Sequence, residues 1–78
     1  MSSNSILKDF GVHLKNIRVQ KNITQEQLAL LCNLDRTYIS GIERGKRNLS
    51  LINLYKIAES LDIHPSELLA FKVTPTGC

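Results

Sequence analysis

The sequence lacks the features of a membrane protein and of a secreted protein. Its longest uncharged apolar run is far below the ~18 residues of a membrane-spanning helix. The first residues, MSSNSILKDF, have neither the basic region nor the apolar region of a secretory signal. We therefore expect a cytoplasmic protein that makes no membrane contact.

Aromatic residues and cysteines are also scarce. With two phenylalanines, two tyrosines and no tryptophan, the core is expected to be aliphatic. Cys32 lies within an apolar pattern, Cys78 is the last residue, and neither belongs to a CxxC pair. Since nothing indicates an oxidising compartment, we expect Cys32 to be a small core residue and Cys78 to be a thiol in the tail.

Motifs of catalysis and metal binding are absent. The sequence contains no HExxH, no phosphate-binding loop, and no Ser/His/Asp or Cys/His set whose members could meet. His13 and His64 are too far apart in the pattern to suggest a metal site. A chain of 78 residues also offers little volume for a substrate cleft. We expect no enzyme activity, no metal site and no cofactor.

What is present suits one small globular domain over residues 1–78, with 42% hydrophobic and 22% charged residues. The formal charge is +3 and the pI is about 9.1. Cations gather between residues 21 and 47 and acids in the final third: Lys21, Arg36, Arg44, Lys46 and Arg47 against Glu59, Asp62 and Glu67. This asymmetry predicts one face for a polyanion and another face for a different partner.

Apolar spacing and capping residues predict five helices. Apolar residues between Ile6 and Val19 recur at steps of three and four, which is the spacing of one helix face. Thr24 and Gln27 have the spacing of a capping box. No window alternates as a strand does, so we expect an all-α fold. The expected helices cover residues 5–21, Thr24 to Cys32, Arg36 to Glu43, Ser50 to Leu61, and Pro65 to Leu69 with Phe71 as a further candidate.

The second and third expected helices are joined by a short turn. Asn33 tolerates the left-handed backbone that ends a helix, and Asp35 is a favourable N-cap. We expect Ile39 and Ile42 to point inward and Gly45 to end the third helix. The inner face of the fourth helix is expected to carry Leu51, Leu54, Ile57, Ala58 and Leu61. Residues 72–78 have no apolar period and are expected to fray.

Residues 24–48 resemble the helix-turn-helix of the lambda repressor/Cro family. The resemblance is carried by RVQKNITQEQLA, ISGIERGKRNLSL and LYKIAESLDIHPSELL. It implies a compact bundle of five helices with the helix-turn-helix over about residues 24–44. Asn33 stands where the family usually has Gly. His64 stands where Ser or Asp is usual, so the start of the last helix is expected to be less firmly fixed.

The segment NLDRTYISGIERGKRNLSL is also similar to the controller proteins of restriction-modification systems. Those proteins consist of this domain alone and bind DNA as dimers. The resemblance implies a dimeric, sequence-specific transcription regulator that acts on its own promoter region, through a pseudo-palindromic operator in double-stranded DNA. An activator would also contact RNA polymerase. The alternatives are a phage-type or generic repressor of the same family and a protein-interaction module such as an antitoxin.

In this motif the second helix enters the major groove with its first residues nearest the bases. Those residues are Arg36, Thr37, Tyr38 and Ser40, the expected base contacts. Arg36 could donate two parallel hydrogen bonds to a guanine, and Thr37 could meet a thymine methyl. The alternative for Arg36 is a solvated charge. However, the helix dipole disfavours a cation at an N-terminus, so a base or an anion is the better explanation.

Phosphate contacts are expected on both sides of that helix. Gln25 begins the helix before it, where free amides favour an anion, although Gln25 could merely accompany the capping box. The loop that follows supplies Arg44, Lys46, Arg47 and Asn48, with a solvated charge as the alternative for Lys46. The family resemblance further implies that Glu43 pairs with Arg18, late in the first helix.

The final third of the chain is expected to form a homodimer. A single helix in one groove makes few contacts, whereas two-fold symmetry places two helices in successive grooves about 34 Å apart. The fourth helix has more apolar surface than its inner face requires. The interface candidates are Ile52, Tyr55, Ile63, Leu69 and Phe71, each of which could instead complete the core of its own chain.

Overall fold

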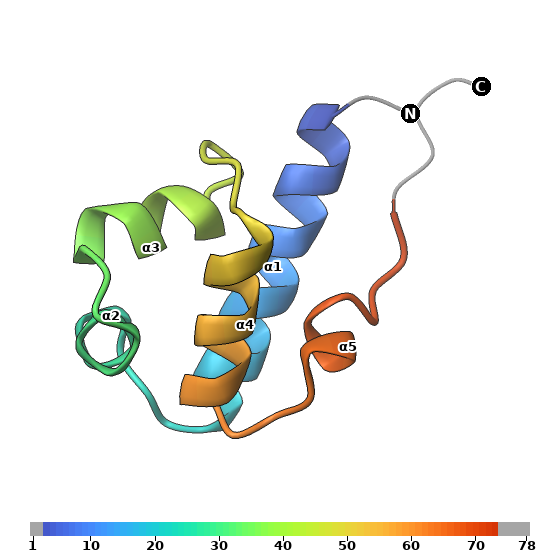
Figure 1. Ribbon diagram of the computed structural model, residues 1–78. Coiled ribbons are helices and arrows are strands. Elements are labelled where there is room, and N and C mark those ends of the chain that lie inside the picture. Colours follow the sequence, from blue (N-terminus) through green and yellow to red (C-terminus); the bar gives the residue numbers. More distant parts are fainter. Residues whose placement is uncertain (1–2, 74–78) are drawn as a thin grey trace.

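The structure, a computed structural model, describes residues 3–73 and contains five helices (Figure 1). They are α1 (Ser3–Gln20), α2 (Gln25–Cys32), α3 (Arg36–Glu43), α4 (Leu51–Ser60) and α5 (Pro65–Leu68). No strand occurs in this part of the chain, so the expected all-α fold of five helices is confirmed. Of the expected frayed tail, residues 74–78, and with them Cys78, lie outside the described residues.

The helices pack around one aliphatic core. In Figure 1, α2 and α3 lie on one side of α4, and α5 lies on the other side. α1 packs against α3 and α5, α2 packs against α3 and α4, and α4 packs against α5. Every helix supplies a side chain that is less than 2% exposed: Leu14, Leu28, Ile39, Ile42, Ile57 and Leu68, joined by Leu61 after α4. Burial of each such side chain stabilises the fold by about 1.5–3 kcal/mol. Ile39 and Ile42 are among them, so the core holds α3 in place.

Four helices end in the same kind of turn. Positive φ angles of 59°, 58°, 73° and 57° occur at Asn22, Asn33, Gly45 and Asp62. The amide of the following residue donates to a carbonyl five residues earlier: Ile23 to Arg18, Leu34 to Ala29, Lys46 to Gly41 and Ile63 to Ala58. Left-handed backbone suits Gly, Asn and Asp, which explains these residue types. After three of the turns, the apolar residue packs against the core.

Two expectations are wrong, one about the inner face of α4 and one about the start of α5. Leu51 is 68% exposed and does not lie on the inner face of α4. At 100° per residue, Leu51 lies at the edge of the buried stripe on the side of Tyr55, in the first turn of the helix. The start of α5 is not loosely fixed, because His64 forms a capping box. Its Nδ1 accepts from the Ser66 amide at 3.1 Å, and its own amide donates to Glu67 Oε2 at 3.1 Å.

Gly11 is the point of closest approach between α1 and α3. A Cβ on Gly11 would lie 2.5 Å from the carbonyl oxygens of both Ile42 and Glu43. These oxygens belong to backbone that is held by the α3 helix, so they cannot move aside as a flexible side chain would. The absence of a side chain at position 11 therefore lets α1 press against the end of α3.

Gly11→Ala should destabilise the fold by about 1–3 kcal/mol, because the added methyl group overpacks the contact between α1 and α3. In an exposed helix interior the same change would instead stabilise by about 1 kcal/mol. Denaturant unfolding measures the difference. Val12→Ala is the matched control, since Val12 is 57% exposed, and we expect a change within about 0.5 kcal/mol. A more stable Gly11→Ala protein would contradict the close approach.

Candidate nucleic-acid interface

The C-terminal end of α3 is anchored by a buried ion pair. Arg18 Nε donates to Glu43 Oε2 at 2.7 Å, and Nη2 donates to Oε1 at 3.0 Å. Both residues are buried, with 8% and 7% of their surface exposed. Hydrogen bonds to Glu43 raise the pKa of Arg18 above its ordinary value, so the guanidinium stays charged. The pair that the resemblance implied thus joins α1 to α3 in bidentate geometry.

Two further hydrogen bonds extend this anchor to the start of α2. Arg18 Nη1 donates to the carbonyl of Ile23 at 2.8 Å, and Gln25 Nε2 donates to Glu43 Oε1 at 3.0 Å. The side chain of Gln25, an expected phosphate contact, is therefore directed inward and is half-buried. The hydroxyl of Thr24 accepts from the Gln27 amide, as the capping-box spacing predicts. The network fixes the position of α2 relative to α3.

The opposite end of α3 is open to solvent. Arg36 and Thr37 are exposed in its first turn, and Ser40 is half-buried one turn later. Asp35 has the extended backbone of an N-cap, but its side chain makes no capping hydrogen bond. Since the other end of the helix is buried, the residues of this exposed turn are those that α3 can present to a groove.

Tyr38 ties this part of α3 to the elements that follow. Its hydroxyl donates to the carbonyl of Asn48 at 3.3 Å and accepts from Asn53 Nδ2 at 3.1 Å. The ring is half-buried against the core. Tyr38, one of the expected base contacts, thus has an intramolecular role that connects α3, the loop after it and α4.

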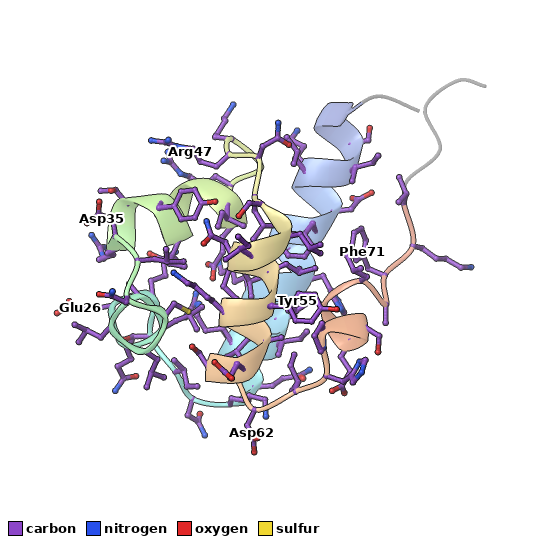
Figure 2. The ribbon with its side chains drawn as sticks, viewed as in Figure 1. Glu26, Asp35, Arg47, Tyr55, Asp62 and Phe71 are labelled. Atoms are coloured by element: carbon purple, nitrogen blue, oxygen red, sulfur yellow. The ribbon has the colours of Figure 1, made fainter. Side chains whose placement is uncertain are left out.

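The loop between α3 and α4 carries the remaining cations. Arg44 Nε donates to the carbonyl of Ser40 at 3.4 Å, while Lys46 and Asn48 are exposed. Arg47 lies across α3 at Gly41, where a Cβ would be 2.6 Å from Arg47 Cγ. Figure 2 shows Arg47 and Asp35 along α3, with Tyr55 and Phe71 on the other side of α4. Arg47 and the start of α3 therefore lie on the side of α4 opposite Phe71.

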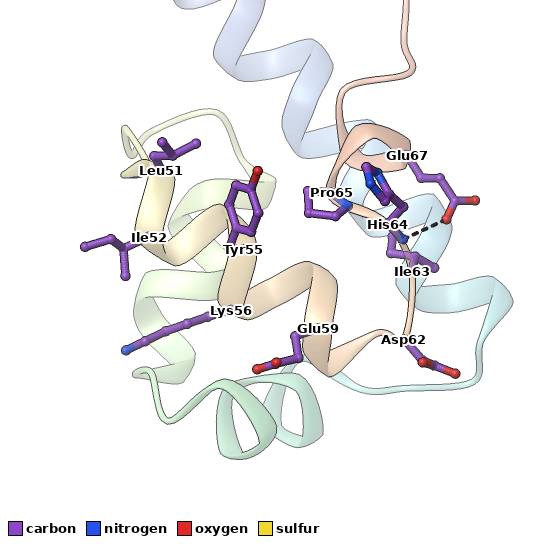
Figure 3. A pocket seen from close by; sticks show the side chains of 10 residues that line it. All are labelled: Leu51, Ile52, Tyr55, Lys56, Glu59, Asp62, Ile63, His64, Pro65 and Glu67. Atoms are coloured by element: carbon purple, nitrogen blue, oxygen red, sulfur yellow. Dashed lines mark hydrogen bonds between the residues drawn. The ribbon is translucent and has the colours of Figure 1, made fainter.

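The side of the molecule that carries Tyr55 contains an apolar groove between α4 and α5 (Figure 3). Tyr55 faces Pro65 across the groove, with Leu51 and Ile52 at one end and Ile63 at the other. Of the expected interface residues, Ile52, Tyr55 and Leu69 are 71%, 56% and 56% exposed. Ile63 and Phe71 are half-buried and also pack against the core of their own chain. The ring of Phe71 lies 5.9 Å from that of Phe10, edge to face.

Some features of the site are not evident from spacing. The roles of Gly11 at α3, of Gln25 at Glu43 and of Asn53 at Tyr38 depend on contacts between distant residues.

Burial raises the pKa of the Cys32 thiol, which keeps it protonated. None of the described helices is long and apolar enough to cross a membrane, and residues 3–73 contain no cluster of three metal-ligating side chains.

The chain is similar in sequence and in fold to known proteins. The model of the helix-turn-helix family matches residues 14–68. The control protein C.BamHI of Bacillus amyloliquefaciens is 50% identical over 70 residues, which cover 88% of this chain and 86% of that protein. The crystal structure of the restriction-modification controller protein C.AhdI from Aeromonas hydrophila has a TM-score of 0.80 and 51% identity, covering 81% and 96% of the two chains.

A further solved structure includes DNA. The restriction-modification controller protein C.Esp1396I, as a tetramer in complex with its natural 35 base-pair operator, has a TM-score of 0.75 and 44% identity. The match covers 82% of this chain and 84% of that chain.

Proposed function

We propose, since this chain belongs to the helix-turn-helix family of DNA-binding transcription regulators, that it is the controller of a restriction-modification system. It binds a pseudo-palindromic operator in its own promoter region as a homodimer. It is a regulator and not an enzyme, as its relatives are control and controller proteins. Residues 1–78 act as one domain, with the helix-turn-helix at about residues 24–44, and the place of action is the cytoplasm, where an operator is accessible.

One observation carries the proposal: α3 is buried and ion-paired at one end and exposes Arg36 and Thr37 at the other. A major groove about 12 Å wide admits one helix, and a helix that enters by its first turn brings those side chains to the base edges. Arg44, Lys46, Arg47 and Asn48 follow directly, so they lie where a loop beside the groove meets phosphates.

Footprinting on the DNA upstream of the gene tests the proposal. We expect a protected site with two half-sites whose centres are about 34 Å apart, which is one helical turn. Protection next to a promoter together with more transcript in a purified transcription reaction would support contact with RNA polymerase. Stable copurification with a different protein, without any protected DNA site, would favour the antitoxin alternative.

The dimer uses the exposed apolar residues of α4. Ile52→Asp should convert a dimer into a monomer, because it places a charge in a face that a partner would bury. Analytical ultracentrifugation at micromolar concentration measures the change. Val12→Asp is the matched control, since Val12 is similarly exposed but lies on α1. A monomeric mass for the unmodified protein would refute the dimer, and a dimeric mass for Ile52→Asp would place the interface elsewhere.

A further inference from the structure

We propose that Lys8, in the second turn of α1, extends the phosphate-binding surface of the loop between α3 and α4; this inference rests on the proposed function. The two segments are in close contact. A Cβ on Gly45 would lie 2.9 Å from Lys8 Cα, 3.0 Å from its nitrogen and 2.8 Å from its Cγ. Gly45 has a φ of 73°, which turns the chain at this contact. Lys8 is therefore beside the loop although 37 positions separate it from Gly45.

Charge distribution indicates what Lys8 binds. Lys8 is exposed, as are Arg44, Lys46 and Arg47 around the same loop. The salt bridge between Arg18 and Glu43 neutralises none of these four cations. Like charges brought together repel one another, and a bound anion reduces that repulsion. Nucleic-acid phosphates supply such anions in a row, about one charge per 1.7 Å of duplex.

Lys8 lies on α1, so its phosphate contact would add to those of the loop and would not replace them. A lysine is a flexible point charge with a long stem, so it needs no bidentate geometry to reach a phosphate. Because Lys8 lies on a separate helix, it would contact the DNA backbone beside the phosphates that the loop binds. The contact would be independent of base sequence, which distinguishes it from the role given to Arg36.

Binding of Lys8→Gln to operator and to random duplex, measured as a function of salt concentration, tests the inference. Each lost phosphate contact should reduce the magnitude of the slope of log affinity against log salt by about 0.9 per protomer. At 0.1 M salt this corresponds to roughly eightfold weaker binding per protomer, on both duplexes. Lys8→Arg should keep the slope. Arg47→Ala is the reference for a loop contact and should also lower it.

Lys15→Gln is the matched control. Lys15 is exposed on the same face of α1, two turns and about 10 Å further from the loop, and the slope should not change. If Lys8→Gln kept the original slope while Arg47→Ala lowered it, the inference would be overturned and the proposed function would stand. An equal loss from Lys15→Gln would also overturn it, as an effect of overall charge. If the unmodified protein bound no duplex, the proposed function itself would fail.

Discussion

Glu43→Ala should lower the free energy of unfolding by about 3–5 kcal/mol, the loss typical of removing one partner from a buried ion pair. The substitution leaves the Arg18 guanidinium and the Gln25 amide without their acceptor inside the protein. Arg18 is only 8% exposed and is also held by the carbonyl of Ile23, so its guanidinium cannot simply turn toward water. Thermal or denaturant unfolding without DNA gives the value directly.

Two controls separate the ion pair from a general effect of removing an acid. Glu26→Ala removes an exposed acid from the first turn of α2 and should cost less than about 1 kcal/mol. The double variant Arg18→Met with Glu43→Leu should recover much of the loss, since apolar replacement of a whole buried pair is often neutral. A change within about 0.5 kcal/mol for Glu43→Ala would show that the pair contributes nothing to stability.

Arg36→Ala should weaken binding to the operator by about 1–3 kcal/mol for each half-site, the range for one bidentate contact to guanine. Affinity for random DNA should fall less, because the phosphate contacts remain. Preference at one base pair in each half-site should relax. The measurement is a binding-site selection with the original protein and the variant in parallel.

Arg44→Ala is the natural comparison for Arg36→Ala. Arg44 is an exposed cation at the opposite end of α3, and its side chain donates back to the carbonyl of Ser40. Its loss should weaken binding to all sequences alike. If Arg36→Ala left every base preference unchanged, Arg36 would be a phosphate contact and not a reader of sequence.

The fold was predictable because its signals are local. Apolar residues at steps of three and four mark the helices, and Thr24, Ser50 and Pro65 mark three of their starts. The turn at Asn33 follows from the tolerance of Asn for left-handed backbone. These signals act within a few residues, so a single sequence contains them in full.

The orientation of particular side chains was less predictable because it depends on distant partners. Nothing near Gln25 indicates that its amide meets Glu43, and nothing near Tyr38 indicates that its hydroxyl meets Asn53. Leu51 fits the buried spacing of α4 and is nevertheless exposed. The start of α5 was misjudged for another reason: the ring nitrogen of His64 caps the helix as a Ser or Asp oxygen would. The roles of Arg36, Thr37 and the loop cations in DNA binding stay predictions.

The four left-handed turns at the helix ends also bear on how the chain acquires its structure. Each closes through a hydrogen bond that spans five residues, so the length of each helix is decided by nearby chain chemistry. Helical domains dominated by such short-range contacts fold in microseconds to milliseconds. The bidentate contact between Arg18 and Glu43 spans 25 positions and has a larger loop-closure entropy to overcome. We therefore expect the contact between α1 and α3 to form after the turns at the helix ends.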